Sequence, residues 1–157
     1  MKITLLTMGK TDVPWVRQGL ELYVSRLAHY VPFSLDEIPE LKNVSSLSET
    51  QIKAKEGELL LARVKPSDEV ILLDEHGKEF RSVEFAAMIE KKLAAGGRGL
   101  VFVVGGAYGF SEEVYRRADG RISLSKMTYS HQMVRTIFAE QLYRAFTIIK
   151  GEPYHHE

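Results

Sequence analysis

LVFVVGGAYG, residues 100–109, joins five consecutive apolar residues to a glycine-rich turn. A second apolar run, EVILLD at residues 69–74, lies earlier in the chain and is also followed by a glycine, Gly77. Short apolar runs of this kind, separated by helical patterns, are typical of the strands of a parallel sheet that helices cover on both faces. The two runs therefore predict an α/β fold, with Gly77 turning the chain after the first strand.

Helical patterns flank both apolar runs. From about Pro14 to Ala28, apolar residues recur at intervals of three and four, which gathers them on one face of a helix. Ser48 and Gln51 form a capping-box signature for a helix that ends near Arg63. Further helices are expected from Ser82 to the glycines at 96–99, from Glu112, and from His131 to Lys150, and further strands at Lys2–Thr7, Phe33–Ile38 and Ile122–Leu124, with a loop at Pro39–Leu47.

The composition limits the class of protein. A chain of 157 residues that is 45% hydrophobic can bury one core, so we expect a single domain over residues 1–157. It contains no cysteine, which excludes disulfides and thiolate metal sites and makes the cytoplasm the default location. No apolar segment at the start is long enough for a signal peptide or a membrane span.

The charges balance, with 21 basic and 21 acidic residues, so the chain as a whole does not attract nucleic acid. Binding to RNA then requires a local cationic patch near the C-terminal helix, although scattered surface cations have the same appearance in the sequence. The candidates are Arg116, Arg117, Arg121, Lys126, Arg135, Arg144 and Lys150.

Three motifs fail on their context. Gly9-Lys10-Thr11 lacks the earlier glycine of a phosphate-binding loop, where Thr4 stands instead. Gly97-Arg98-Gly99 precedes its strand, whereas a dinucleotide fingerprint follows one. The pair His155-His156 has no other clustered ligands, so we expect no metal site.

The glycines at 105–109 are a stronger candidate for a ligand loop. They leave a buried strand at its carboxyl end, where ligands bind in open α/β sheets. Glycine lets the backbone approach a bound molecule closely, and Ser111 then caps the next helix. An ordinary tight turn is the alternative. The run Leu72–Gly77 supplies a second loop at the same edge, which favours a ligand site.

Ordered motifs in the second half of the chain resemble those of one family. They are Gly105-Gly106-x-x-Gly109, Leu124-Ser125-x-Met127-Thr128-x-x-His131-x-x-x-Arg135, Glu140-Gln141-Leu142-Tyr143-Arg144-Ala145 and Pro153-Tyr154-His155-His156-Glu157. With LDExGK at residues 73–78, the sequence resembles, from Lys2 to its end, the RlmH family of small ribosomal RNA methyltransferases of the SPOUT class.

This resemblance implies a parallel-sheet α/β/α sandwich with a C-terminal trefoil knot, which generic folding rules would not predict. It implies transfer of a methyl group from S-adenosylmethionine to N3 of pseudouridine 1915 in 23S ribosomal RNA, on the assembled ribosome. Residue by residue, it implies a cofactor site that binds largely through main-chain groups, formed by Leu73, Gly105, Leu124, Ser125, Lys126, Met127, Thr128 and Tyr129. His156 departs from the family, in which arginine is common at this position.

For catalysis, we expect His155 to transfer a proton or contact the base, with Tyr154 stacking or hydrogen bonding beside it. A frayed tail is the alternative. Arg144 has the planar fork that suits a phosphate or the cofactor carboxylate, while an ion pair with Glu140 one helical turn earlier is the competing interpretation. His131, at the start of the last helix, is expected to organise the loop before it.

The last helix carries apolar residues on more than one side, so one face is expected to meet the sheet and another to meet a second copy of the chain. The resemblance agrees with a homodimer and implies that the tail of one protomer completes the pocket of the other. Two other functions stay open: a ribosome-binding or RNA-binding factor without activity, and a methyltransferase of the same class with a different RNA target.

Overall fold

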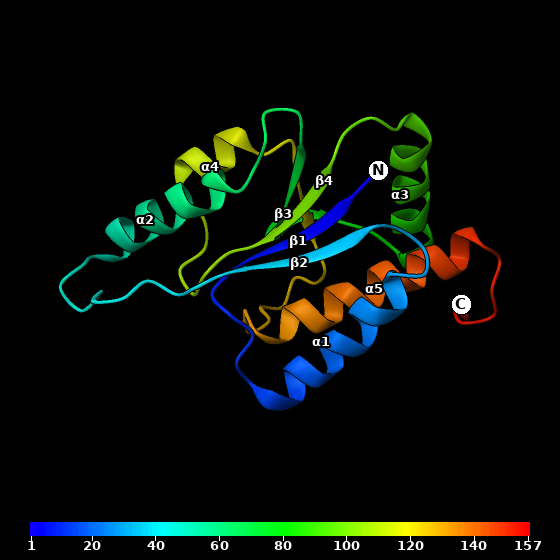
Figure 1. Cartoon of the computed structure of the whole chain (residues 1–157), viewed down its shortest axis with the longest axis horizontal. Helices are drawn as coiled ribbons and strands as arrows, with labels where there is room; N and C mark the ends of the chain where they lie inside the picture. The colour runs from blue at the N-terminus through cyan, green and yellow to red at the C-terminus, as the bar shows by residue number, and fades with distance from the viewer.

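The computed structural model describes all 157 residues and contains one five-stranded sheet (Figure 1). The strands lie in the order β2-β1-β4-β3-β5, and every neighbouring pair is parallel. This confirms the predicted α/β class. The strands are β1 (Ile3–Met8), β2 (Phe33–Ile38), β3 (Glu69–Glu79), β4 (Leu100–Val104) and β5 (Gly120–Ser123).

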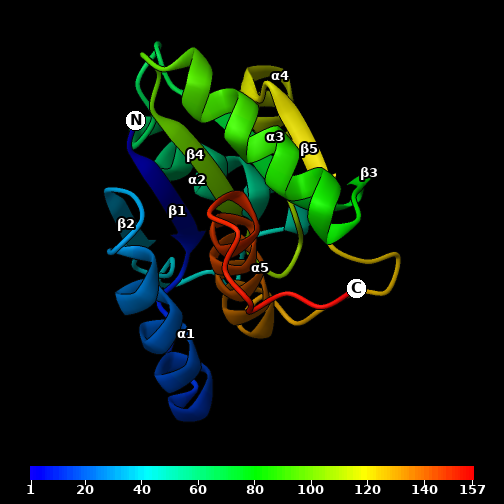
Figure 2. The same ribbon diagram turned by 90° about the vertical axis from the view of Figure 1, so that its right-hand side faces the viewer.

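Helices cover both faces of the sheet, as the two apolar runs predict. Figure 1 shows α2 and α4 on one side and α1 and α5 on the other, and Figure 2 shows α3 beside α5. Alternate side chains of each strand point to opposite faces, so β1 places Leu5 in the larger core cluster and Leu6 in the smaller one. The helices are α1 (Pro14–Leu27), α2 (Glu49–Ala62), α3 (Ser82–Ala95), α4 (Glu112–Arg117) and α5 (Met133–Ile149).

Local side-chain chemistry determines where several elements begin and end. The hydroxyl of Ser48 accepts a hydrogen bond from the main-chain N–H of Gln51 at 3.1 Å, and the side chain of Gln51 accepts one from the N–H of Ser48 at 2.9 Å. The predicted capping box is thus confirmed. Ser111 caps α4 as expected, and Gly96, with φ at +64°, ends α3.

The predicted end of the third strand was wrong. Instead of turning at Gly77, β3 continues to Glu79, and residues 74–77 form a bulge. Leu73 and Lys78 on either side of this bulge both face Ile122 of β5. A Cβ on Gly77 would lie 2.8 Å from main-chain atoms of Ile122, so only glycine lets the two backbones approach this closely.

The elements on either side of the last loop differ from their predicted bounds: β5 covers Gly120–Ser123 rather than Ile122–Leu124, and α5 is shorter than predicted. β5 ends at Ser123, opposite the last residue of β3, so Leu124 lies outside the ladder. α5 begins at Met133 rather than His131, and residues 131 and 132 form a turn that the hydrogen bond from the N–H of Met133 to the hydroxyl of Ser130, at 3.0 Å, closes.

Arg135 is fully buried inside the molecule, which corrects its assignment to a surface RNA patch. Its guanidinium donates to the carbonyl oxygens of Met8 at 3.1 Å, Gly9 at 2.9 Å and His131 at 2.9 Å, and to the hydroxyl of Thr11 at 2.8 Å. Burial lowers the pKa of Arg135, while nearby carboxylates, of which Glu37 at 3.6 Å has the largest effect, oppose that shift. The side chain thus ties the loop after β1 to the beginning of α5.

Replacement of Arg135 by Met should lower the free energy of unfolding by about 3–5 kcal/mol, because it leaves buried acceptors and Glu37 without their partner. Urea titration measures this loss. The matched variant Arg116→Met removes an exposed arginine and should change the free energy by less than about 0.5 kcal/mol. Equal effects of the two substitutions would contradict the role given to Arg135.

Candidate active site

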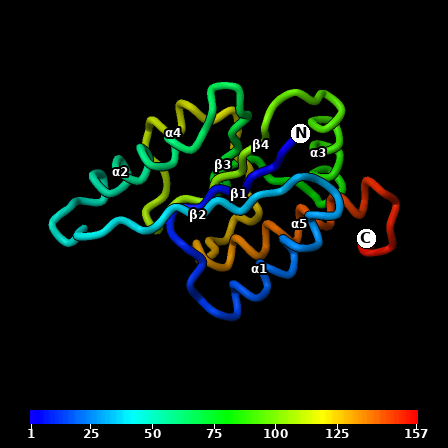
Figure 3. The backbone as a smooth tube through the Cα atoms, viewed as in Figure 1, coloured from blue at the N-terminus to red at the C-terminus, as the bar shows by residue number.

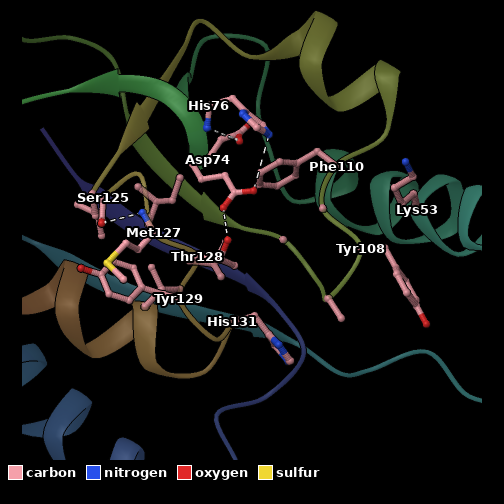
Figure 4. Close-up of a pocket in the computed structure, with 18 of the residues that line it drawn as sticks. Lys53, Asp74, His76, Tyr108, Phe110, Ser125, Met127, Thr128, Tyr129 and His131 are labelled. Carbon is pink, nitrogen blue, oxygen red and sulfur yellow. Dashed lines mark hydrogen bonds and ion pairs between the residues drawn. The ribbon is translucent and has the colours of Figure 1, made fainter.

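A cavity of about 390 Å³ lies beside the bulge of β3 and the ends of β4 and β5, at the carboxyl edge of the sheet. This volume is within the usual range for small-molecule sites, and the carboxyl edge is where ligands bind in such folds. Figure 4 shows side chains from strand ends, from α2 and from the loop before α5 gathered around it. A second, larger groove, of about 690 Å³, lies at the opposite edge and has a mainly polar lining.

Most of the predicted cofactor residues line the carboxyl-edge cavity, and so does His131. Lys126 does not: its side chain is 86% exposed and is 3.9 Å from Glu79 on the outside of the loop. The structure thus brings together residues that are up to 58 positions apart in the chain. The predicted residues in the lining are Leu73, Gly105, Leu124, Ser125, Met127, Thr128, Tyr129 and His131.

The loop at residues 124–132 is held at its start by serine hydroxyl groups and at its end by the side-chain amide of Gln132. Ser123 donates its hydroxyl to the carbonyl oxygen of Ser125 at 2.7 Å, and the hydroxyl of Ser125 accepts the N–H of Met127 at 3.0 Å. At the other end, the side chain of Gln132 bridges to the main chain of Lys10 and Asp12. Between these anchors Met127 is 78% exposed, so the middle of the loop projects over the cavity rather than into the core.

The glycine loop is shaped by the ring of Phe110. A Cβ on Gly105 would lie 2.9 Å from this ring, so any larger residue there would force the ring to move. Both residues line the cavity. Gly109 has φ at +85°, a conformation that side chains disfavour. The predicted ligand loop is therefore a constrained wall of the cavity.

Two carboxylates from the bulge of β3 form an acidic wall that the sequence only hinted at. Asp74 accepts a hydrogen bond from the hydroxyl of Tyr115 at 2.6 Å, and Glu75 accepts one from the hydroxyl of Thr128. Burial, followed by the bond to Asp74, raises the pKa of Tyr115 to about 12. The Leu72–Gly77 run indicated these carboxylates, whereas nothing in the sequence distinguished Tyr115, or Lys53 from α2, as part of the lining.

The other predicted catalytic residues form a second cluster at the end of α5. Arg144 and Glu140 make an ion pair at 2.7 Å, and the hydroxyl of Tyr154 donates to Glu140 at 2.7 Å. A ring nitrogen of His155 lies 3.0 Å from Arg144. The hydrogen bond to Glu140 raises the pKa of Arg144, and burial, with hydrogen bonds to Tyr23 and Glu140, raises that of Tyr154. The tail is thus tied down, and the guanidinium of Arg144 is occupied within the chain.

The cavity and the tail cluster lie at opposite ends of α5. Val134 lines the cavity, and Arg144 follows ten residues later, which is about 15 Å along a helix. Figure 3 shows the tail at the far end of α5 from the loop that precedes it. One copy of the chain therefore does not bring its own tail to its own cavity.

Neither a metal centre nor a membrane span is found. The structure contains no group of three or more histidine, aspartate or glutamate side chains placed to hold a metal ion. None of its helices is both long and apolar enough to cross a membrane.

Comparison with known families decides the relationship. Residues 1–155 match the family model described as predicted SPOUT methyltransferase. The chain belongs to the SPOUT methyltransferase family. Proteins named ribosomal RNA large subunit methyltransferase H are similar over the full length of both chains: that of Parabacteroides distasonis is 56% identical over 157 residues, and that of Flavobacterium psychrophilum is 54% identical over 157 residues. This confirms the predicted resemblance.

A solved structure supports the SPOUT fold. The chain is similar to a probable methylase family protein from Haemophilus influenzae, with a TM-score of 0.52 and 12% identity, over 99% of this chain and 70% of that one. Together with the family match, this establishes the predicted α/β fold with a C-terminal knot. In this SPOUT chain, Arg135 joins the first loop of the sheet to the beginning of α5.

Replacement of Tyr115 by Phe should make the stability of this SPOUT chain less dependent on alkaline pH. A pKa raised from 10.0 to about 12 contributes stability that is complete below pH 10 and is lost as the pH rises towards 12. The variant should be less stable than the parent at pH 8, and the difference should shrink above pH 10. Urea titrations from pH 8 to pH 11.5 measure it, with the exposed Tyr108→Phe as control. A difference that stays constant across this range would refute the assignment.

Proposed function

We propose that this chain methylates N3 of pseudouridine 1915 in 23S ribosomal RNA with S-adenosylmethionine, on the assembled ribosome and as a single methyltransferase unit over residues 1–157. The observation that carries the proposal is the cavity at the carboxyl edge of the sheet, lined by seven of the eight residues expected to hold the cofactor. The names of the full-length relatives, which are ribosomal RNA methyltransferases, support the class of substrate.

The lining fits the chemistry of this cofactor. Leu73, Val104 and Phe110 give apolar walls suited to an adenine ring, and the loop 124–129 offers main-chain groups at its edge. Asp74 and Glu75 bring negative charge to the same cavity, which suits a positively charged sulfonium centre. When bound, S-adenosylmethionine supplies a methyl group that is already activated, so the chain's own task is chiefly to position it and to exclude water.

The target base must then meet the tail cluster, which lies about 15 Å along α5 from the cavity of the same chain. We propose that two copies of the chain combine, so that Tyr154 and His155 of one copy reach the cavity of the other. Large apolar side chains remain exposed near the beginnings of α1 and α5, including Trp15, which is 63% exposed, and Met133. Such side chains favour burial in a homodimer interface.

The experiment that tests the function uses ribosomes from a strain that lacks this modification. Incubation with the purified chain and S-adenosylmethionine should add one methyl group to the pseudouridine at position 1915, which mass spectrometry of ribosomal RNA fragments detects. Methylation at another nucleotide would instead favour a different RNA target, and no methylation with no heat of cofactor binding would favour a binding factor.

The cofactor site is tested by Gly105→Val. The added side chain would push the ring of Phe110 into the cavity, so the affinity for S-adenosylmethionine should fall by about tenfold or more. Isothermal titration calorimetry measures this fall. Lys126→Ala is the matched control, because that side chain points away from the cavity and its removal should leave affinity unchanged. Unchanged affinity of the Gly105 variant would exclude this cavity.

A mixing experiment tests whether two copies share one site. His155→Ala and Gly105→Val each damage one half of the site, so each homodimer should have little activity when S-adenosylmethionine is kept well below the Kd of the Gly105 variant. Refolding the two variants together should restore activity, because one site of each mixed dimer then has an intact cavity and an intact tail. A mixture of His155→Ala with Tyr154→Ala, both tail variants, should show no recovery. Failure of the first mixture to recover would mean that each chain uses its own tail.

A further inference from the structure

The imidazole of His155 has one nitrogen engaged and one without a partner. Its Nδ1 lies 3.0 Å from Nη1 of Arg144. A guanidinium is always protonated and can only donate hydrogen bonds, so Nδ1 must be the acceptor of this bond. In the neutral ring, the single proton is then on Nε2. The contact with Arg144 thus selects one of the two tautomers of His155.

Arg144 is itself fixed in place by its neighbours. Its Nη2 donates to Glu140 at 2.7 Å, its Nε lies 3.4 Å from the same carboxylate, and its guanidinium is 4.8 Å from the centre of the Tyr154 ring. The ring of Tyr154 packs in turn against the ring of Tyr143 of α5, with 4.7 Å between the two ring centres. The guanidinium of Arg144, which faces His155, is therefore held in place by an ion pair and by packing against an aromatic ring.

The second nitrogen, Nε2, is buried and has no hydrogen-bond partner. The nearest acidic atom is Oε1 of Glu157, at 3.9 Å, which is beyond hydrogen-bond distance. Buried donors are nearly always paired in folded proteins, so an unpaired N–H at a position expected to meet substrate indicates that a ligand acceptor completes it.

We infer that His155 acts as a hydrogen-bond donor through Nε2 to a carbonyl oxygen of the target base, with Arg144 and Glu140 as the positioning residues that keep it in this tautomer. The inference rests on the proposed function, and it assigns His155 a different task from removal of the imide proton. Nδ1 is blocked as a base by Arg144, and Nε2 already carries the proton.

A hydrogen-bond donor at this position suits the chemistry of the target base. N3 of a pseudouridine lies between two carbonyl groups, and loss of its proton to solvent water leaves a negative charge that those two oxygens share. The nitrogen lone pair then forms the bond to the methyl carbon as the bond from that carbon to sulfur breaks, and the electron pair stays on the sulfur. A donor aimed at one oxygen stabilises the charge as it develops.

Charged and titratable groups approach His155 from several elements. Arg144 and Glu140 come from α5, Tyr23 from α1 meets the hydroxyl of Tyr154 at 3.5 Å, and Arg81, just before α3, pairs with Glu157 at 2.9 Å. That last pair is exposed and closes the end of the tail beside Nε2. A donor role for Nε2 requires that the final residues move when the base binds, because Nε2 is buried in the free chain.

The first test needs no activity. Long-range nitrogen–proton correlation spectra of the ¹⁵N-histidine-labelled protein at about pH 8, assigned with His155→Ala, identify the protonated ring nitrogen. We expect the proton on Nε2, and we expect Arg144→Met, which removes the donor, to give a mixture of both tautomers. A proton on Nδ1 in the parent protein would overturn the inference.

The second test follows single-turnover methylation of ribosomes between about pH 6 and pH 8.5. If His155 is only a hydrogen-bond donor, solvent removes the proton from N3, and the rate should rise about tenfold for each pH unit. A histidine that acts as the base would instead give a plateau above the ordinary imidazole pKa of about 6.5. His155→Ala should lower the rate by about 10²-fold to 10³-fold. His155→Gln, whose amide N–H can replace Nε2–H, should keep the rate within about tenfold of the parent.

A plateau near neutral pH in the active parent protein would overturn the donor role while leaving the proposed function intact. Absence of methylation by the parent protein would overturn the proposed function, whereas the nitrogen spectra would still decide the tautomer. Arg144→Lys separates positioning from simple stability: we expect a lower rate constant, an unchanged KM for S-adenosylmethionine and partial loss of the single tautomer. A rate equal to that of the parent would exclude Arg144 as a positioning residue.

Discussion

The buried guanidinium of Arg135 is the interaction on which the C-terminal half of the molecule depends. It satisfies carbonyl oxygens after β1 and before α5 at the same time, so the position of α5 follows from that of the first strand. The loop that covers the cavity ends at this anchor, and the tail cluster lies at the other end of the same helix. A buried charge is costly unless it is fully paired, which makes this one arrangement strongly preferred over its alternatives.

Apolar patterning and turn chemistry were sufficient to predict the sheet, the five helices and the edge of the sheet that carries the cavity. They failed where contacts between residues far apart in the sequence determine the burial of a side chain or the length of a strand. The burial of Arg135 depends on carbonyl groups more than 120 positions away, and the continuation of β3 past Gly77 depends on the backbone of β5. The cofactor residues came from the family resemblance, and Lys126 fell outside the lining because main-chain position does not fix where a side chain points.

The candidate site separates two tasks along one helix. The end near Val134 belongs to a cavity with an acidic wall, and the end near Arg144 belongs to a cluster in which an ion pair, two tyrosines and a histidine order one another. Because α5 keeps the cavity and the tail cluster at a fixed distance, the tail of one chain cannot fold over the cavity of the same chain unless the tail cluster breaks. In the proposed homodimer, a second copy of the chain would bring the two parts of the site together, and it would also widen a surface whose charges cancel overall.

The bulge of β3 has a consequence for how such a site can change over generations. Leu73 and Lys78, on either side of residues 74–77, pair with the same residue of β5, so we expect substitutions, and even insertions, at positions 74–76 to leave this pairing in place. The acidic wall of the cavity can therefore vary in length and charge while the sheet keeps its register. Gly77 is the exception, since the close approach of the β5 backbone excludes a side chain there. Proteins of this fold that bind other ligands are thus expected to differ at positions 74–76 and to keep glycine at position 77.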